Sequence, residues 1–268
     1  NVHLKIDSGM NRLGFKCKED LKKAIELLNK NKKIYIEGIY THLATSGVND
    51  QFYDKQISSF EQITSLVDLS NIPIVHINRS ITLVHHKKLP YETGTRLGII
   101  MYGFDSKIKE ATGLRKLKKQ IIHKLKKISP TITGEPLDVQ SAYSLYTEVL
   151  STRQVKKGDF IGYGATYIAK EDMLIATLPI GYADGMSPKI KYVIINNKKC
   201  EILGDICMDM TIVRIDSSIK IHDKVEVFGN KTSIRSIANM MGTNVYHVLT
   251  GITSRVPRVY QDNEEIKY

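Results

Sequence analysis

The amino-acid sequence predicts an α/β domain followed by an all-β domain. Residues 1–104 alternate apolar, strand-like segments with amphipathic helical segments and have no hairpin turn between them, which is typical of parallel strands joined by crossover helices. From about residue 140 the chain changes to short strand-like segments separated by Gly, Asn and Asp, which is typical of an all-β domain. The length of 268 residues fits one large domain or two ordinary ones, and 42% hydrophobic residues are enough for a sizeable core.

The first part contains four expected strands and two expected long helices. The strands are expected at residues 2–6, 34–44, 72–78 and 95–103, and the helices at residues 18–31 and 52–67. The first helix has acidic residues near its start and lysines near its end, as the helix dipole favours. Four such units fit either half of a closed barrel or part of an open sheet.

Polar groups stand at the ends of these strands. They are Arg12 after the first strand, His42 after the second, Ser80 after the third, and Arg96 at the head of the fourth, next to the amides around Gly98. In a parallel α/β architecture the site lies at the carboxyl ends of the strands. Arginines and backbone amides bind phosphate or another anion. We therefore expect an anion site at these strand ends.

The second part contains short strands and then two short helices. The strands are expected around residues 155–159, 161–167, 173–180, 194–200, 205–215 and 223–230, and the helices at residues 233–242 and 244–252. The buried strand 173–180 leads to Tyr182, which lies between Gly181 and Gly185. Because glycines allow irregular turns, two interpretations stay open: an ordinary hairpin, or a reactive phenol delivered at the end of a rigid strand.

The positive charge of the chain is concentrated in one segment. Most of the net charge of +11 comes from residues 105–130, where a basic amphipathic helix is expected over residues 114–128. Such a helix lies on a membrane surface, binds an acidic partner or nucleic acid, or simply packs on its own domain with a solvated face. We favour the last interpretation and expect no nucleic-acid partner.

Three cysteines, Cys17, Cys200 and Cys207, are too few and too scattered for a disulfide framework. This number fits a reducing, cytoplasmic setting, and Cys207 is expected as a buried thiol in a strand. The histidines have no metal-ligand spacing, so no metal site is expected. No segment has the length of a membrane span or the pattern of a signal peptide, and no nucleotide-binding fingerprint or serine elbow is present.

Seven motifs in a fixed order resemble the alanine racemases, a family of enzymes that use pyridoxal phosphate. They are HLKIDSGMNRLGF (3–15), IYTHLATS (39–46), RLGIIMYG (96–103), IGYGATY (161–167), PIGYADGMS (179–187), ICMDM (206–210) and RVPRVY (255–260). The resemblance implies a partial (β/α)8 barrel of the TIM type followed by a C-terminal β domain. We expect residues 1–104 to be the C-terminal half of the barrel, residues 105–136 a basic helical insertion, and residues 137–268 the β domain.

The resemblance also implies roles in the transfer of a proton at the α-carbon of alanine. Tyr182 matches the family's catalytic tyrosine, a base on one face of the α-carbon that is contributed across a homodimer, so that each site uses two chains. His42 matches the histidine packed against the ring of pyridoxal phosphate and linked to that tyrosine. Arg96 matches the arginine that faces the pyridine nitrogen, where a cation weakens the electron sink.

Further matches imply how the cofactor and substrate are bound. Arg12 matches the arginine near the cofactor's phenolic oxygen and the substrate carboxylate, and Lys5 matches a lysine that is often carbamylated and holds that arginine. Met208 matches the residue whose backbone meets the substrate carboxylate. The remaining matches form the phosphate cradle: Ser80, the amides of Gly98 and Ile99, and Tyr246.

One family motif has no counterpart in the chain. The cofactor lysine lies in a motif like VVKANAYGHG, and no lysine among the 268 residues is assigned that role. Because the chain begins on a core-like strand, we expect it to be the C-terminal portion of a longer racemase, inactive by itself, whose whole form interconverts L- and D-alanine through an aldimine with two bases, Tyr and Lys, for peptidoglycan synthesis.

Several positions differ from the family, and some alternatives stay open. Arg79 stands where Asn is usual, Gly47 where Asp is usual, Asp205 where Arg is usual and His247 where Glu is usual. Two of these positions, 47 and 205, line the corridor to the site. The alternatives are the C-terminal domain of a membrane-fused serine or alanine racemase, a non-catalytic dimerising remnant, and a decarboxylase of the same fold. The last uses an acid at the pyridine nitrogen, so Arg96 argues against it.

Overall fold

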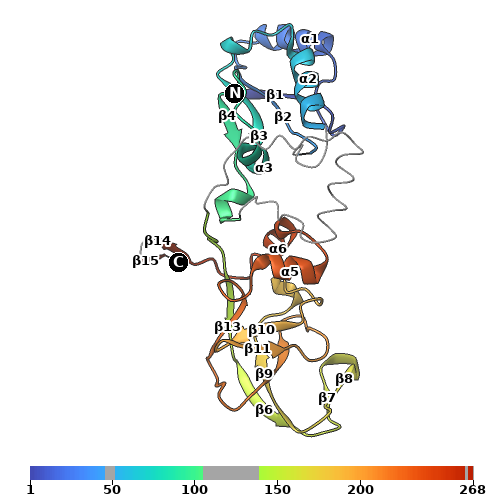
Figure 1. Cartoon of the computed structure of the whole chain (residues 1–268), viewed down its shortest axis with the longest axis vertical. Coiled ribbons are helices and arrows are strands. Elements are labelled where there is room, and N and C mark those ends of the chain that lie inside the picture. Colours follow the sequence, from blue (N-terminus) through green and yellow to red (C-terminus); the bar gives the residue numbers. More distant parts are fainter. Residues whose placement is uncertain (46–51, 105–138, 263–264, 268) are drawn as a thin grey trace, which may run out of the picture. The chain divides into compact units, whose positions relative to one another are not determined.

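The chain divides into two compact units, Asn1–Gln140 and Ser141–Tyr268. The computed structural model describes residues 1–45, 52–104, 139–262 and 265–267. Within these residues the first unit is α/β with a parallel sheet and the second contains antiparallel sheets (Figure 1). The predicted fold class is therefore confirmed. The expected insertion at 105–136, with its basic helix at 114–128, lies outside the described residues.

Unit 1 is built on a four-stranded parallel sheet with the strand order β1-β2-β3-β4. The strands are β1 (Val2–Ile6), β2 (Ile36–Thr41), β3 (Ile74–Arg79) and β4 (Gly94–Arg96), and the helices are α1 (Lys18–Asn29), α2 (Phe52–Thr64) and α3 (Ser80–His85), with 3-10 turns at Leu69–Asn71 and Ile99–Tyr102. Sequential strands are neighbours, as the βαβ pattern predicts.

Alternate residues of the strands face the core of unit 1. Ile6, Ile39 and Ile77 are fully buried and pack with Leu21 of α1 and Phe60 of α2. Burial of one such side chain stabilises the fold by about 1.5–3 kcal/mol. Because side chains alternate along a strand, the residues between these positions point to the opposite face of the sheet, where the candidate site lies.

The fourth strand is shorter than predicted. Residues 95–103 were expected as one strand, but β4 ends at Arg96 and a 3-10 turn begins at Ile99. Gly98 has φ −141° and ψ −107°, a backbone conformation outside the strand and helix regions. The apolar run Ile99–Tyr102 therefore turns away from the sheet and does not extend it.

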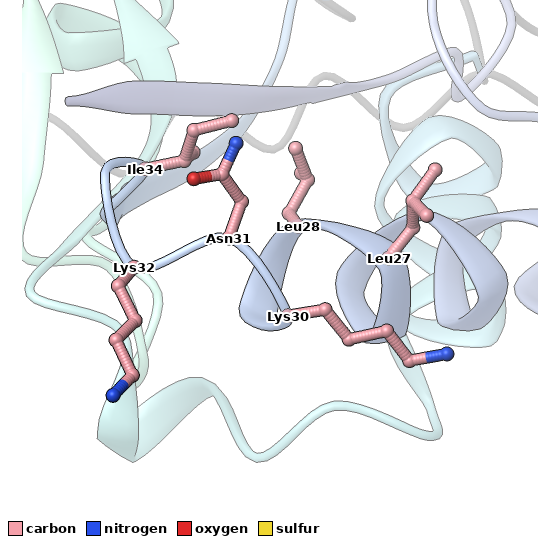
Figure 2. Close-up of a pocket in the computed structure, with 6 residues that line it drawn as sticks. All are labelled: Leu27, Leu28, Lys30, Asn31, Lys32 and Ile34. Carbon is pink, nitrogen blue, oxygen red and sulfur yellow. The ribbon is translucent and has the colours of Figure 1, made fainter.

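A hollow of about 510 Å³ lies at the C-terminal end of α1. In Figure 2, Leu28 and Ile34 point to the same side, whereas the amino groups of Lys30 and Lys32 point away from them. This segment leads into the first residue of β2, so the hollow lies at the amino ends of the strands. It is therefore at the edge of the sheet opposite to the polar strand ends, and the sequence had not indicated it.

The described part of unit 2 contains two main antiparallel sheets and two short α-helices (Figure 1). One sheet has the order β11-β10-β13-β5 and the other has the order β12-β9-β6. The elements are β5 (Leu145–Glu148), β6 (Ser151–Val155), β7 (Phe160–Ile161), β8 (Tyr167–Ile168), β9 (Met173–Leu178), β10 (Tyr192–Ile195), β11 (Lys198–Glu201), β12 (Thr211–Ile215), β13 (Lys224–Phe228), α5 (Ile234–Met241), α6 (Val245–Gly251), β14 (Tyr260–Asp262) and β15 (Glu265–Lys267).

The expected strand at 205–215 begins only at Thr211. The Cys207 amide donates to the Met210 carbonyl at 2.9 Å, which closes a tight turn before the strand. The expectation of a buried Cys207 in a strand was therefore wrong, because Cys207 lies in this turn and is only partly buried, whereas Cys200 is buried.

Candidate active site

Arg12 is carried by a loop that folds back onto the end of β1. The Phe15 amide donates to the Lys5 carbonyl at 2.9 Å, and the Asp7 amide donates to the Phe15 carbonyl at 2.9 Å. Gly14 has φ +126°, and a Cβ there would lie 2.7 Å from the Asp7 nitrogen. Only glycine fits this close approach, which holds the loop, with exposed Arg12 at its tip, beside the end of the strand.

His42 directly follows β2 and lies among positive charges. Burial, followed by Arg96, Arg79, Arg12 and Lys5, lowers the pKa of His42 from 6.5 to about 4. The imidazole is therefore neutral near pH 7. All four charged groups that act on it are cations, so the carboxyl edge of this sheet attracts an anion.

A buried carboxylate organises the end of β3. Glu92 is 3% exposed, and its Oε1 accepts the amides of Ile77 at 3.0 Å and Asn78 at 2.6 Å. Its Oε2 accepts the Asn78 side-chain amide at 2.6 Å. The carboxylate thus satisfies N–H groups where the register between β3 and β4 shifts.

Ser80 and Gly98 meet where α3 and the 3-10 turn Ile99–Tyr102 begin. The Gly98 amide donates to Ser80 Oγ at 2.8 Å. A Cβ on Gly98 would lie 3.5 Å from the same oxygen. Ser80 is buried and Ile99 is 7% exposed. The structure therefore brings together three of the four residues expected in the phosphate cradle.

Arg96 points across the carboxyl ends of the neighbouring strands. Its Nη2 donates to the carbonyls of Thr41 at 2.6 Å and Ile77 at 3.1 Å, and its Nη1 lies 3.4 Å from His76 Nδ1. Burial lowers its pKa, which Tyr40 and Glu92 partly oppose, but a guanidinium stays charged. These contacts use three of its five N–H groups, and the other two have no hydrogen bond to any described residue.

Sequence reasoning missed the residues on the site side of the strands below this edge. His76 stacks on Tyr40 with 4.7 Å between ring centroids, and His3 Nδ1 lies 2.8 Å from His76 Nε2. Burial, Arg96 and His3 lower the pKa of His76 to about 4. A signal was present, because the residues on the site side alternate with the buried residues Leu4, Thr41 and Ile77 in His3-Leu4-Lys5, Tyr40-Thr41-His42 and His76-Ile77-Asn78.

In unit 2, Tyr182 begins a 3-10 turn and not a hairpin. Among the described strands, β9 pairs with β12 and β6, so the chain leaves the sheet after Leu178. The Tyr182 amide donates to the Cys207 carbonyl at 3.0 Å. A Cβ on Gly181 would overlap the carbonyl oxygens of Cys207 and Met208. The hairpin interpretation is therefore wrong, and the turn is held by close contact with another loop.

The loop with Met208 and the helix with Tyr246 are both joined to this turn. The Ala183 amide donates to the Met208 carbonyl at 3.0 Å. Gly185 has φ +102°, and a Cβ there would overlap the carbonyl oxygen of Gly251, the last residue of α6. Tyr182, Met208 and Tyr246 are 49%, 53% and 46% exposed. Unit 2 thus presents three large, half-exposed side chains on connected segments.

The residues at the carboxyl edge of unit 1 fit an anionic cofactor such as pyridoxal phosphate. Arg79 Nε and Asn78 Oδ1 are buried and have no hydrogen-bond partner among the described residues. Buried polar atoms without partners are rare in folded proteins. Together with the Ser80–Gly98 contact and the cations around His42, these atoms provide both charge and hydrogen-bonding capacity for a phosphate-bearing ligand.

The described residues contain neither a metal-ligand cluster nor a helix that could span a membrane. No group of three or more His, Cys, Asp or Glu in those residues is arranged to hold a metal ion. No helix within the same part of the chain is long and apolar enough to cross a membrane.

Gly47, one of the corridor positions, lies outside the described residues. The other, Asp205, is exposed, and Thr166 Oγ1 donates to its Oδ2 at 3.4 Å.

Comparison with known proteins gives consistent matches along the chain. Residues 1–106 match the family model described as alanine racemase, N-terminal domain, and residues 142–260 match the alanine racemase, C-terminal domain. The alanine racemase of Pediococcus pentosaceus is 34% identical over 98% of this chain, which spans 66% of that relative's length.

Solved structures agree with these matches. The alanine racemase of Clostridium difficile 630 superposes with a TM-score of 0.82 at 33% identity, over 100% of this chain and 66% of that one. The histidine racemase of Leuconostoc mesenteroides superposes with a TM-score of 0.74 at 25% identity, over 94% of this chain and 64% of that one. Both domain models match in order, and the relatives align with nearly the whole of this chain. The chain therefore belongs to the alanine racemase family.

Proposed function

We propose that this chain forms part of a racemase that interconverts L- and D-alanine with pyridoxal phosphate as its cofactor. The observation that carries the proposal is the neutral His42 among four cations, beside the Ser80–Gly98 contact, at the carboxyl ends of the strands. Dedicated anion sites of this kind suit a phosphate-bearing cofactor, and the family membership directs the choice to pyridoxal phosphate.

The proposed contacts with the cofactor follow the family matches. Ser80, the amides of Gly98 and Ile99, and Tyr246 would bind its phosphate, and Arg12 its phenolic oxygen. Arg96 would face the ring nitrogen with the N–H groups left over from its contacts to Thr41, Ile77 and His76. When bound, pyridoxal phosphate supplies an electron sink that makes the α-proton of an amino acid acidic, and a guanidinium at the nitrogen keeps that sink weak.

Tyr182 would move the proton on one face of the substrate. The backbone contacts that fix its turn hold the phenol in one place, which is what a base needs to meet a carbon-bound proton. His42, neutral near pH 7, would pack on the cofactor ring and hydrogen-bond the phenol. The Met208 backbone and Arg12 would bind the substrate carboxylate, and a carbamylated Lys5 would hold Arg12.

The whole enzyme would be a cytoplasmic homodimer with sites shared between two chains, supplying D-alanine for peptidoglycan. Because the chain spans 66% of its curated relative and none of its lysines is assigned to the cofactor, we expect it not to racemise alanine by itself. The second base would be a lysine outside these 268 residues. A non-catalytic dimerising remnant is the alternative.

Binding of the cofactor tests the proposal directly. The purified chain is titrated with pyridoxal phosphate and with pyridoxal, and binding is followed by absorbance. We expect pyridoxal phosphate to bind at least about tenfold more tightly, since a phosphate site contributes more than about 1.4 kcal/mol. Ser80→Ala should lose this preference, and the matched control Ser70→Ala, at an exposed turn, should keep it.

Equal affinity for the two compounds, or a Ser80→Ala variant that keeps the preference, would contradict the proposal. Borohydride reduction followed by intact mass then shows whether a lysine of this chain carries the cofactor. A mass increase at one lysine would overturn the expectation of inactivity, and racemisation of L- and D-alanine would then be measured on the same sample.

Alanine is the first substrate to test, but it needs competitors. The exposed Asp205 replaces a basic residue that is usual in the family's corridor, and a structural relative at 25% identity is named a histidine racemase. This change of charge favours a cationic amino acid as the second candidate, and serine stays the alternative left open by the sequence. Serine and histidine are therefore assayed beside alanine in an enzyme that contains this chain, and a higher kcat/KM for either would reject alanine.

A further inference from the structure

Four side chains form a row that begins at the Arg96 guanidinium and ends at the Glu37 carboxylate on β2. Arg96 Nη1 lies 3.4 Å from His76 Nδ1, and His76 Nε2 lies 2.8 Å from His3 Nδ1. His3 Nε2 lies 3.2 Å from Glu37 Oε2, while Glu37 Oε1 accepts from the Asn1 side chain at 3.0 Å. The proposed function assigns no role to His76, His3 or Glu37.

Gly38 gives His3 the space to reach across β2. His3 lies on β1 and His76 on β3, and β2 separates the two strands. His3 is in register with Gly38, where a Cβ would overlap the His3 ring. Tyr40, two residues further along β2, stacks on the His76 ring with 9° between the planes. The strand between the two histidines is thus shaped so that their rings meet.

The ends of the row determine the position of each proton along it. A guanidinium only donates hydrogen bonds and a carboxylate only accepts them. Arg96 therefore donates to His76 Nδ1, so a neutral His76 carries its proton on Nε2 and donates to His3 Nδ1. His3 then carries its proton on Nε2 and donates to Glu37. Every bond in the row points from the cation to the anion.

We propose that Glu37 and His3 are positioning residues that hold the Arg96 guanidinium in a fixed orientation through His76. Reversing one link shows why the far end matters. If His3 carried its proton on Nδ1, His76 would have to carry its own on Nδ1, and that N–H would face the Arg96 donor. Glu37 prevents this arrangement by requiring a donor at His3 Nε2.

The row complements the two carbonyl contacts of Arg96. Thr41 and Ile77 accept from Nη2, and His76 is the acceptor for Nη1, so all three together define the plane of the guanidinium. The proposed function determines which group Arg96 faces in the assembled enzyme. The row of side chains does not depend on that proposal. It lies within unit 1 and needs no ligand to form.

The first experiment measures the tautomers directly. The full chain is labelled with 15N-histidine, and the ring nitrogen shifts of His3 and His76 are recorded near pH 7 without pyridoxal phosphate. We expect both rings to be neutral with the proton on Nε2. A proton on Nδ1 of either ring overturns the proposal, and this result needs no variant.

The second experiment breaks the far end of the row. Glu37→Leu removes the acceptor, Glu37→Gln keeps a carbonyl oxygen but removes the charge, and Gly38→Ala places a Cβ in the His3 ring. The matched control is Glu148→Leu, because Glu148 Oε2 lies 3.2 Å from an exposed histidine, His222, in unit 2. Fold is compared by thermal unfolding and amide spectra.

The pKa of His42 is the readout, because Arg96 is the first of the charges that lower it. In Glu37→Leu and Gly38→Ala we expect mixed tautomers at His76 and a His42 pKa that rises by about one unit as Arg96 moves away. Glu37→Gln and Glu148→Leu should keep the wild-type values. Wild-type tautomers and an unchanged His42 pKa in a folded Glu37→Leu variant overturn the proposal. Failure to bind pyridoxal phosphate with the row intact would reject only the proposed function.

Discussion

The pKa of His42 reflects burial and all four cations that lie near it at the strand ends, Arg96, Arg79, Arg12 and Lys5. Burial and these cations, which three strand ends and the loop after β1 contribute, lower the pKa to about 4. A group of like charges at one edge is unfavourable unless a counter-charge binds there. The positive potential of these groups therefore favours the binding of an anion, and the phosphate of a cofactor is such an anion.

Arg79 makes a distinct contribution to this cluster. Its Nε is buried without a partner among the described residues, and its charge acts on both His42 and Arg96. In Arg79→Asn, which restores the residue usual in the family, we expect the pKa of His42 to rise by roughly 0.5 or more because a nearby cation is lost. Histidine NMR titration measures this, and Arg214→Asn, at an exposed ion pair in unit 2, is the control. An unchanged titration would place Arg79 outside the cluster.

Tyr182 gives a directional prediction. In an active enzyme that contains this chain, Tyr182→Phe should slow removal of the α-proton from one enantiomer by about 10²–10⁴-fold and spare the other, since the phenol serves one face only. Solvent deuterium incorporation into L- and D-alanine measures each direction separately. Tyr192→Phe, on β10, is the control. Equal and mild losses in both directions would remove Tyr182 from the role of base.

At the scale of elements, Gly14 connects local backbone to the position of Arg12. Gly14→Ala should destabilise unit 1 by about 1–3 kcal/mol, because the new Cβ meets backbone atoms of Asp7, Lys5 and Ile6 that cannot move independently of β1. Gly158→Ala is the matched control: it also has positive φ, but nothing lies within 4 Å of its Cβ. Urea unfolding should show a larger loss for Gly14→Ala, and equal losses would mean that the close contact is not important.

The elements that the sequence predicted well are those whose signals are local. β1, β2 and β3 were located because apolar residues mark their cores, and α1, α2, α5 and α6 because their apolar residues recur at helical spacing. The strand ends were predicted as a site from local signals too, since His42 and Ser80 directly follow β2 and β3 and Arg12 lies in the loop after β1.

The elements that were missed depend on distant residues. β4 ends early because the chain turns at Gly98, whose amide donates to the Ser80 hydroxyl on another element, and the local apolar pattern does not reveal this contact. The Tyr182 turn is held by carbonyls near residue 207, and a local pattern of glycines cannot distinguish it from a hairpin. The contact of His3 with His76 spans two strands and depends on the missing Cβ of Gly38.

For the whole molecule, the neutral histidines predict how stability depends on pH. Folding lowers the pKa of His42 and His76 from 6.5 to about 4, so between these values the unfolded chain binds more protons than the folded one. Stability should be complete above pH 6.5 and fall as the pH decreases toward 4. Urea midpoints across this range test it. His42→Asn combined with His76→Asn should flatten the slope, and an unaltered slope would assign the effect to other groups.

The alternation of β2 has a consequence for how the protein tolerates changes of length. Ile39 and Thr41 are buried in the core, whereas Tyr40 and His42 lie on the other side of the sheet. Removing a single residue before Tyr40 would exchange the two sets, so that His42 would face the apolar core and an isoleucine would face the candidate site. Natural diversification of this site is therefore confined to replacements at every second position, and insertions or deletions of one residue should be absent from functional relatives within these strands.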